Sequence, residues 1–550
     1  MPPPQRYILW ALCILLGASL FYGIQSPPLR DYRETTYAEI GREMLGDTDY
    51  LVPHLNDSPH LDKPPLVPWL VALSFTAFGV SQGATRLVSV LAVLWTALVL
   101  GWMTRRIFGP GRGLLAAILL LGTPGMQYYG RMLMTDTVFL ACTLTALAAF
   151  VEGYLRDQRG WYYVGFAACG LGVLARGLLG AAYPIATLMV FCVAVARQAS
   201  RRVPWTAGLL PLLICTVPWF ALIAMKYPGF LDLFFIQHHV HRLTPMHSHP
   251  FVAVPRGHIL LGFAGFLGPL LFCLPWALRA NAGARSSQHF LWLFSLIVLA
   301  SVLISTGRNQ PYTLPALPPL VALVAGWLGG LGEGISPACG RFPAVPVGLL
   351  GLAILGLLPW LPQIAAGISP LLAPPTTRLV VQVCMTMVAM VAVLGGVLLW
   401  RGKGPAACAT LAALMLPGAH MLVHVQQQLA PLESRAALAR TVAQEVPPTW
   451  PVVVANPRDI LFEGVGGWGF YAHRQVFMVA FVPPGAGPFW GITRPEWLLD
   501  MQDLQELWTA EQPLALAATP EAVAQLPFGA LPPPRACDEK FCLWFVLHHR

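Results

Sequence analysis

Long apolar segments dominate this chain and restrict its fold more than any other feature. Segments of about 17 to 24 residues with almost no charge recur along the first 424 positions, and a helix of that length crosses the roughly 30 Å hydrocarbon core of a bilayer. With 56% apolar and only 11% charged residues, a soluble globule is excluded, because its surface needs about twice that charge. The sequence therefore predicts an α-helical polytopic membrane protein.

We expect about 13 transmembrane helices. The first segment could alternatively be a signal peptide, since Arg6 precedes it; the single charge and the lack of an A-x-A cleavage site favour a retained helix. The expected spans are residues 7–24, 85–103, 114–128, 137–154, 161–175, 180–196, 205–224, 258–278, 289–304, 312–330, 343–361, 377–400 and 405–424.

Basic residues gather in alternate connections between these spans. Because Lys and Arg in short loops resist translocation, the bias places the N-terminus inside and the C-terminal region outside, on the periplasmic or equivalent face of the membrane. Residues 64–79 are apolar but short and rich in proline, so we expect a helix lying in the outer interface. The inner cations are Arg6, Arg105, Arg106, Arg112, Arg156, Arg159, Arg197, Arg201, Arg202, Arg279, Arg285, Arg341, Arg401 and Lys403.

Acidic residues concentrate in the first outer loop. Eight of the 25 acidic residues lie between Arg30 and Pro65. Charges at membrane depth are costly and usually line a site, so we expect one outward-facing polar cavity, roofed by this loop and the C-terminal region. An amphipathic helix should begin near Glu34. The acidic residues expected on the solvent-exposed face of the loop are Glu39, Glu43, Asp47, Asp49 and Asp57.

Several short motifs occur in order on the outer side. They are RETTYAEIGREM at 33–44, DKP at 62–64, RMLMTD at 131–136, ARG at 175–177, FFIQHHVHR at 234–242 and STGRNQPYTLP at 305–315. Together they resemble the GT-C membrane glycosyltransferases of family 39, the protein O-mannosyltransferase-like family, and within it the bacterial transferases that add 4-amino-4-deoxy-L-arabinose to lipid A. The resemblance runs along nearly the whole chain.

The resemblance implies both a fold and a reaction. The fold would be a GT-C transmembrane domain at 1–424, with a periplasmic juxtamembrane loop at 31–82, followed by a periplasmic α/β domain at 425–550. The reaction would move a sugar from a polyprenyl (undecaprenyl) phosphate donor to an outer-leaflet or periplasmic acceptor, with lipid A or lipopolysaccharide favoured. No nucleotide sugar, cofactor or nucleic acid would be needed. Another sugar or a protein acceptor stays open.

The resemblance also implies site residues. Glu34 and Tyr37 match the family's D-E-x-x-Y motif, but Arg33 replaces its first acidic residue, so Glu34 or Asp31 would supply the catalytic carboxylate. An acceptor that is already anionic would need little base. Substrate and phosphate contacts would come from Arg33, Tyr37, Asp62, Lys63, Arg131, Asp136, Arg176, His239, Arg242, Arg308 and Tyr312.

Each of these residues also has a simpler explanation. The carboxylates could be solvated loop charges, Asp62 and Lys63 could form a local ion pair, Asp136 could hold a cation, and the arginines could bind lipid headgroups. His238, His239, His241, His247 and His249 are irregularly spaced and favour a wetted loop over a zinc site. His420 and His424, four residues apart, could bind a divalent metal with Asp62.

The last 126 residues are more polar. Residues 426–445 and 501–511 are expected to be helices, and 450–456, 475–482, 514–519 and 541–549 to be strands, which together predict a small α/β domain. Glycines at 464–470 are expected to form a turn. Cys537 and Cys542 could close a hairpin as a disulfide in an oxidising compartment.

Two other classes of function stay open. A lipid or oligosaccharide transporter would usually carry internal repeats and charges near the membrane midplane, whereas the unusual charges here sit at one face. A sensor or scaffold that has lost catalysis would fit the Arg33 substitution.

Overall fold

A computed structural model of the chain describes residues 3–47, 49–240, 254–281, 286–331, 335–457, 464–481, 495–510, 512–526 and 531–546. Its contacts divide the chain into two compact units. The first unit comprises Met1–Ile24, Arg86–Ala221 and Phe235–Val425, and the second comprises Gln25–Thr85, Leu222–Phe234 and Gln426–Arg550. The predicted division into 1–424 and 425–550 stays a prediction, because the contacts group residues 25–85 with the C-terminal region.

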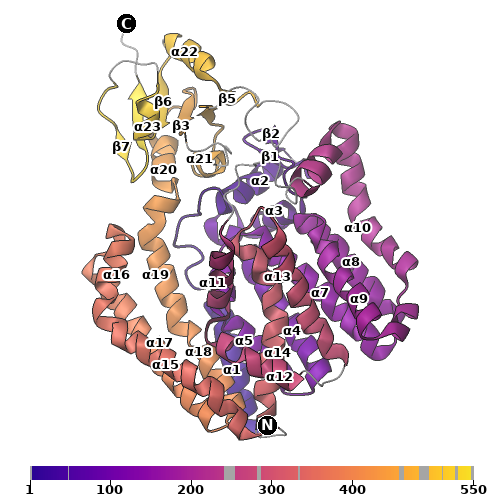
Figure 1. The fold of residues 1–550 in the computed structure, drawn as a ribbon. Helices are drawn as coiled ribbons and strands as arrows, with labels where there is room; N and C mark the ends of the chain where they lie inside the picture. The colour runs from indigo at the N-terminus through magenta and orange to yellow at the C-terminus, as the bar shows by residue number, and fades with distance from the viewer. Residues whose placement is uncertain are drawn as a thin grey trace. The chain divides into compact units, whose positions relative to one another are not determined.

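The first unit is a helical bundle (Figure 1). Most of α4, α10 and α19 belong to it. Its helices are α1 (Pro3–Ser19), α4 (Gln82–Phe108), α5 (Arg112–Leu121), α6 (Pro124–Tyr129), α7 (Thr135–Arg156), α8 (Arg159–Arg176), α9 (Leu179–Ala194), α10 (Trp205–Lys226), α11 (Arg256–Leu267), α12 (Leu274–Asn281), α13 (His289–Ile304), α14 (Leu317–Gly330), α15 (Arg341–Leu357), α16 (Leu361–Ile368), α17 (Pro375–Trp400), α18 (Gly404–Ala413) and α19 (Met415–Glu433).

The chain is a multi-pass membrane protein. In the described residues, 8 helices are long and apolar enough to cross a membrane, or 9 if the bent pair Arg256–Phe272 and Leu274–Ala280 forms one span. Every range that the sequence predicts to span contains a helix, but several of these helices are shorter than a full span. The expected number of about 13 therefore stays a prediction.

A tight turn joins α7 to α8 in the bundle. Asp157 ends α7 in the left-handed conformation, with φ of 56°, and α8 begins at Arg159. This short connection makes α7 and α8 antiparallel neighbours, which lie side by side in Figure 1. The N-terminus of α7 and the C-terminus of α8 therefore lie at the same end of the bundle.

The second unit contains the first loop and a small α/β fold. Helices are present where the sequence predicts them, α3 within residues 64–79 and α2 beginning at Glu34; the position of α3 in the membrane interface stays a prediction. The elements are α2 (Glu34–Asp47), β1 (His54–Leu55), β2 (Ser58–Pro59), α3 (Leu66–Phe78), α20 (Ala436–Glu445), β3 (Val452–Ala455), α21 (Val465–Ala472), β4 (Phe477–Val479), β5 (Leu498–Leu499), α22 (Met501–Thr509), β6 (Leu514–Ala518), α23 (Pro520–Val523), β7 (Ala536–Cys537) and β8 (Cys542–Val546).

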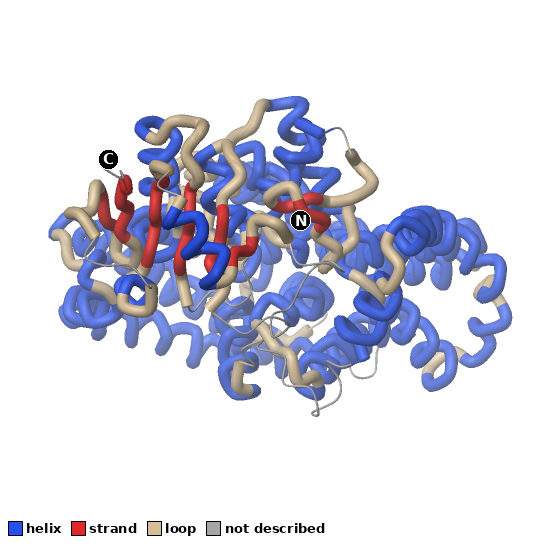
Figure 2. Tube along the Cα trace, turned by 90° about the horizontal axis from the view of Figure 1, so that it is seen from above, coloured by secondary structure: helices blue, strands red, loops and turns tan. Residues whose placement is uncertain are grey.

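Six strands of this unit form one sheet in the order β5-β4-β3-β6-β8-β7 (Figure 2). β3 pairs in parallel with β4 and β6, whereas β8 runs antiparallel to β6 and β7. All residues of β3 and β6 are buried, as expected for central strands covered on both faces. The four strands and the helices predicted in this region are confirmed over the residues that the structure describes, except that the helix predicted at 426–445 is interrupted at Ser434 and Arg435, between α19 and α20.

One prediction in this region is wrong. The glycine-rich stretch 464–470 belongs largely to a helix, α21, and not to a turn. The glycines let α21 pack tightly against the segment around α2: a Cβ on Gly466 would collide with the backbone of Thr36, and one on Gly467 with the carboxylate of Asp31. Glycine is therefore selected here by close approach between helices, which outweighs its low helix propensity.

Candidate active site

Three residues expected in the site meet in the first unit. Asp136 lies in the first turn of α7, Arg176 ends α8, and Tyr312 lies in the 3-10 helix Gln310–Ala316. Arg176 forms an ion pair with Asp136, and its guanidinium carbon lies 4.2 Å from the centroid of the Tyr312 ring. The side chains of Arg176 and Asp136 are only 12% and 4% exposed. The structure therefore places a largely desolvated, ring-stacked arginine at this end of the bundle.

The helix ends favour this charge arrangement. A carboxylate is stabilised at a helix N-terminus and a cation at a C-terminus, which matches Asp136 on α7 and Arg176 on α8. Tyr183 of α9 extends the cluster, because its hydroxyl lies 2.8 Å from Ser301 Oγ and its ring contacts Phe139. Sequence reasoning missed Tyr183, whose only signal was a phenol inside an apolar span.

Arg131 and Arg308 also lie in the first unit, but each is bound to nearby main-chain carbonyls. Arg131 is buried and donates to Gln127 Oε1 at 2.7 Å and to the carbonyls of Ser19 and Gln127. Burial lowers the pKa of Arg131 to about 10, so it remains charged at neutral pH. Arg308 donates to the carbonyls of Val254 and Ser305. Both guanidinium groups therefore hold turns in place.

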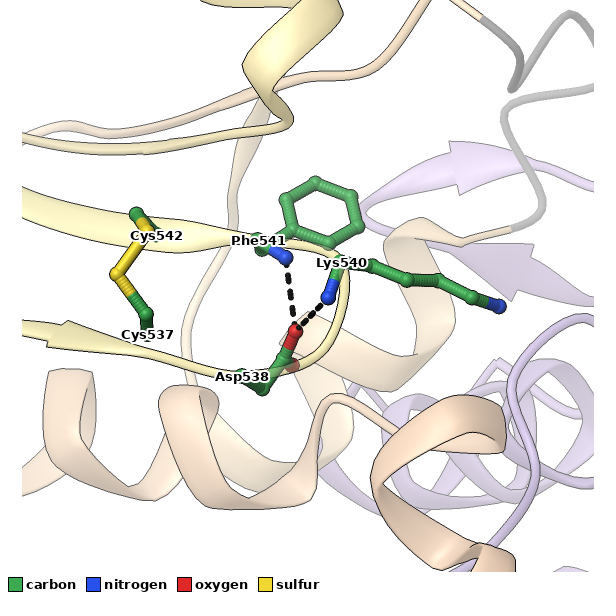
Figure 3. Close-up of a disulfide and its surroundings, with 5 residues drawn as sticks. All are labelled: Cys537, Asp538, Lys540, Phe541 and Cys542. Carbon is green, nitrogen blue, oxygen red and sulfur yellow. Dashed lines mark hydrogen bonds between the residues drawn. A yellow bond between two sulfur atoms is a disulfide. The ribbon is translucent and has the colours of Figure 1, made fainter. Parts of the chain in front are cut away.

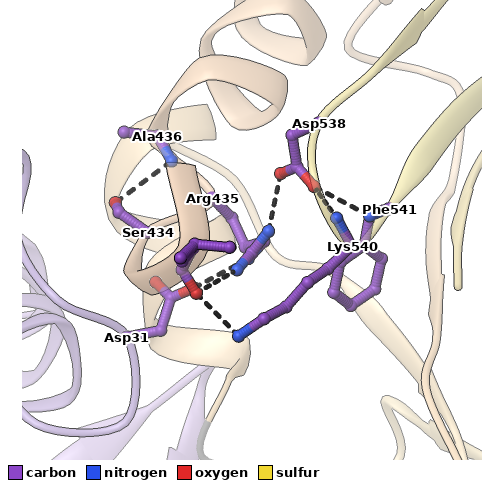
Figure 4. A network of polar contacts seen from close by, with 8 residues as sticks. Asp31, Ser434, Arg435, Ala436, Asp538, Lys540 and Phe541 are labelled. Atoms are coloured by element: carbon purple, nitrogen blue, oxygen red, sulfur yellow. Dashed lines mark hydrogen bonds and ion pairs between the residues drawn. The ribbon is translucent and has the colours of Figure 1, made fainter. Parts of the chain in front are cut away.

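In the second unit, Asp31 is tied to an arginine 404 residues away (Figure 4). Arg435 Nε lies 3.2 Å from Asp31 Oδ2, and Arg435 Nη1 lies 2.6 Å from Asp538 Oδ2. All three side chains are at most 8% exposed. The ring of Phe541 lies against the guanidinium, with its centroid at 5.2 Å. We name Asp31, Arg435 and Asp538 the buried triad; the sequence singled out only its first member.

A disulfide-closed hairpin supplies Asp538. Cys537 and Cys542, the pair considered from the sequence, are bonded across the turn between β7 and β8 (Figure 3). Within this turn, Asp538 Oδ1 accepts hydrogen bonds from the backbone N–H groups of Lys540 and Phe541. The carboxylate that contacts Arg435 is thus held in place by its own turn.

Glu34 is the most buried of the matched carboxylates. It is 1% exposed, and its Oε2 accepts a hydrogen bond from the backbone N–H of Arg30 at 3.1 Å. Arg30 in turn pairs with Glu433 at 2.7 Å. Arg33, at the position where the family has an acidic residue, is exposed, and Tyr37 is half-buried. The substitution therefore adds a surface cation and leaves Glu34 enclosed.

Asp62 and Lys63 pair with each other. Lys63 Nζ lies 2.7 Å from Asp62 Oδ2, and both side chains are less than 20% exposed. Next to them His60 is buried, and burial lowers its pKa to about 4, so this imidazole is neutral at physiological pH. The pair therefore has the local geometry that the simpler explanation expected.

The expectation that the remaining loop carboxylates face water is wrong for two of them. Glu39 and Glu43 are buried on α2. Glu39 pairs with Arg42 at 2.7 Å, and Glu43 accepts backbone hydrogen bonds from Asn56 and Asp57. Burial raises the pKa of both, that of Glu43 to about 8. Sequence periodicity missed this because α21 and the β1–β2 turn cover the polar face of α2.

His420 and His424 have different partners. His420 Nδ1 lies 2.7 Å from the hydroxyl of Tyr22, and His424 Nε2 lies 3.2 Å from Thr377 Oγ1. Among the described residues, no group of three or more His, Cys, Asp or Glu side chains could hold a metal ion. The side chains of His238 and His239, and all of His241, Arg242, His247 and His249, lie outside the described residues.

Comparison with known proteins identifies similar chains. Residues 62–221 match the family described as dolichyl-phosphate-mannose-protein mannosyltransferase. The undecaprenyl phosphate-alpha-4-amino-4-deoxy-L-arabinose arabinosyl transferase of Edwardsiella ictaluri is 31% identical over 343 residues, 60% of this chain and 61% of the relative. That of Pectobacterium atrosepticum is 28% identical over 59% of this chain and 60% of the relative. The chain thus spans about three fifths of the curated relatives that it matches.

Solved structures extend the likeness to the whole fold. The crystal structure of ArnT from Cupriavidus metallidurans bound to undecaprenyl phosphate has a TM-score of 0.84 and 22% identity to this chain, and the alignment covers 99% of this chain and 98% of that one. The same protein in the apo state gives the same TM-score. The expected resemblance is therefore confirmed in fold over almost the entire chain and in sequence, at about 30% identity, over about three fifths of it.

Proposed function

We propose that this protein is a glycosyltransferase that moves a sugar from an undecaprenyl phosphate donor to an acceptor in the outer leaflet, with aminoarabinose as the sugar and lipid A as the acceptor. The names of the curated relatives and the undecaprenyl phosphate bound to the similar crystal structure support this proposal. The proposed location is the bacterial inner membrane, with the site facing the periplasm, which the bias of basic residues supports.

The observation that carries the proposal is the cluster of Arg176, Asp136 and Tyr312. The leaving group of the proposed reaction is a phosphate, and an arginine offers bidentate hydrogen bonds to phosphate oxygens. Asp136 and the Tyr312 ring hold the guanidinium in a fixed orientation. A charge held in place and shielded from water stabilises a developing phosphate more strongly than a mobile, solvated one.

The carboxylates then take different roles in the proposal. Asp31 pairs with Arg435 in the buried triad, so we assign it a structural role. Glu34 is the carboxylate proposed to receive or orient the acceptor. If the acceptor is a phosphate of lipid A, its oxygen is already anionic and attacks the anomeric carbon as the bond to the undecaprenyl phosphate breaks. That displacement needs orientation and charge compensation more than a strong base.

The test is transfer by the purified full-length protein reconstituted with undecaprenyl phosphate-linked aminoarabinose and lipid A, with products followed by mass spectrometry. Glu34→Gln keeps the size of the side chain and one acceptor oxygen for Arg30 N–H, and Asp57→Asn changes an exposed carboxylate of the same loop. We expect Glu34→Gln and Arg176→Gln to lose about 100-fold or more in rate, and Asp57→Asn to keep it.

Different outcomes would redirect the assignment. Full activity in both Glu34→Gln and Arg176→Gln would overturn the roles proposed for these two residues. Transfer of another sugar, or to protein, would point to the mannosyltransferase-type chemistry named for the matching family. Movement of the lipid-linked sugar across the membrane without any change in its covalent structure would favour a transporter.

A further inference from the structure

A groove in the first unit shares no lining residue with the clusters described above. It is a cavity of about 1240 Å³ bounded by α1, α4 and α5, larger than the ~300–1,000 Å³ of typical small-molecule pockets. Its wall is mainly apolar, with Trp10, Ile14, Phe21, Leu98 and Trp102 among the lining residues. We name it the arginine groove, because Arg6, Arg105 and Arg112 also line it.

The three arginines gather at one end of the groove. Arg6 lies near the start of α1, Arg105 near the end of α4, and Arg112 begins α5. The connection between α4 and α5 is short, so Arg105 and Arg112 lie on either side of the same loop. The opposite end of the groove is lined by apolar residues such as Phe21 and Leu121. The groove is therefore amphipathic along its length, with a cationic mouth and an apolar interior.

Among the residues that the structure describes, no carboxylate pairs with the arginines at the mouth. Arg106, next to Arg105, pairs with Glu152 at 3.0 Å. In the described part of the chain, Arg6 and Arg105 have no such partner, and no carboxylate lines the groove. Both side chains are exposed. Two neighbouring arginines thus differ: Arg106 links α4 to α7 through its ion pair, and Arg105 lines the groove.

The length of the groove matches one leaflet of a membrane. Along α4 it runs from Leu94 to Arg105, about 11 residues, or about 16 Å at 1.5 Å per residue. That is close to half of the roughly 30 Å hydrocarbon core. Trp10 and Trp102 lie near the cationic mouth, where tryptophan is favoured at the boundary between headgroups and acyl chains.

We propose that the arginine groove binds an anionic glycerophospholipid of the adjacent leaflet, with its phosphate headgroup at Arg6, Arg105 and Arg112 and its acyl chains along α1 and α4. A two-chain lipid fits the large volume and the one-leaflet depth, and the negative headgroup complements the three guanidinium groups. The binding is selective for charge, because a zwitterionic headgroup brings its own cation to a mouth that already carries three. This site is separate from the proposed transfer reaction.

Native mass spectrometry of the full-length protein in detergent tests this proposal. The probes are phosphatidylglycerol and phosphatidylcholine with identical acyl chains, added at equal concentrations. We expect one tightly retained phosphatidylglycerol with at least about tenfold preference over phosphatidylcholine, decreasing as salt is raised. Equal retention of the two lipids would overturn the proposal, because it would indicate an ordinary boundary lipid.

Variants separate this site from general charge. Arg6→Gln combined with Arg105→Gln should weaken phosphatidylglycerol retention by about 30-fold, from about 1 kcal/mol for each arginine near the headgroups. Leu98→Trp places a larger side chain at the exposed wall of the groove, so it should weaken the retention of both lipids. Arg401→Gln, which removes an exposed arginine outside the groove, should change nothing.

The remaining outcomes also decide the matter. If the double variant retains phosphatidylglycerol as strongly as the unchanged protein, or if Arg401→Gln weakens it equally, the groove is not the binding site. A third probe, undecaprenyl phosphate, has an anionic headgroup but a single long chain. If it displaces phosphatidylglycerol and shows the same loss in the double variant, the occupant is the lipid carrier and the proposal for a glycerophospholipid fails.

Discussion

Replacing Arg435 with alanine should loosen two segments that are far apart in sequence. Arg435 bridges Asp31, before α2, and Asp538, in the disulfide-closed hairpin, and its loss leaves two nearly buried carboxylates without their shared cation. Removing one partner of a buried ion pair costs about 3–5 kcal/mol. Asp538 keeps the backbone hydrogen bonds from Lys540 and Phe541, so we expect the lower part of that range.

The comparison variant is Arg440→Ala in α20, the helix that begins directly after Arg435. Arg440 is exposed and lies over the ring of Tyr471 at 4.9 Å, a contact worth about 0.5–1 kcal/mol at such a site. A triple variant, Asp31→Asn with Arg435→Met and Asp538→Asn, removes all three charges together. It should recover most of the lost stability, because a buried ion pair is often no more stable than an uncharged replacement.

Hydrogen exchange of the full-length protein, read by mass spectrometry, measures these effects locally. A loss of about 3 kcal/mol corresponds to exchange about 100-fold faster, in peptides from both 31–44 and 536–546. Arg440→Ala should change exchange in these peptides less than about tenfold. Faster exchange in only one of the two segments, or equal effects of Arg435→Ala and Arg440→Ala, would refute the role of Arg435 as a bridge.

Three further predictions concern the second unit and the reaction. The pKa of Glu43 is raised from 4.5 to about 8, so its contribution to stability is complete below pH 4.5 and disappears as the pH rises through about 8. The melting midpoint of the protein should therefore fall between these two pH values, and it should fall less steeply in Glu43→Gln. Equal slopes for the two proteins would contradict the assignment to Glu43. Gly467→Ala should lower the free energy of unfolding by about 1–3 kcal/mol, because the added carbon would collide with Asp31. Gly160→Ala is the control, because a carbon added there meets nothing within 4 Å. Equal melting midpoints for the two variants would show that Gly467 is not closely packed against Asp31. Dialysis against EDTA should leave transfer unchanged, and a loss that added zinc or magnesium restores would show that the reaction needs a metal.

Much of the fold could be predicted because the signals are local. Helix α2 begins at Glu34 and α3 occupies the proline-rich apolar stretch, both as expected. The buried strands β3 and β6 follow from short apolar runs. Helix α21 could not be predicted this way, because its glycines are explained by the closeness of Asp31 and Thr36, a contact between residues more than 400 positions apart.

The candidate site could be predicted in part. Asp136, Arg176 and Tyr312 stood in separate motifs, and the structure brings them into one cluster. The motifs separated Asp31, Glu34 and Asp62 from the other five acidic residues of the first loop, which were all expected to face water. A carboxylate that is buried by a distant segment and one that faces water have the same local sequence context, so the sequence could not show that two of those five are buried.

The amino-acid sequence by itself determined that this chain is a multi-pass membrane protein with a small α/β region, because the length of an apolar run and the periodicity of a strand are properties of neighbouring residues. Only the tertiary structure decided the state of each charge. In the folded protein Asp31 pairs with Arg435, and Glu39 and Glu43 are buried on α2. Arg106 pairs with Glu152, whereas Arg105 has no carboxylate partner among the described residues. The physical reason is that the energy of a charge depends on its burial and on its partners, and both are set by segments that meet only when the chain has folded.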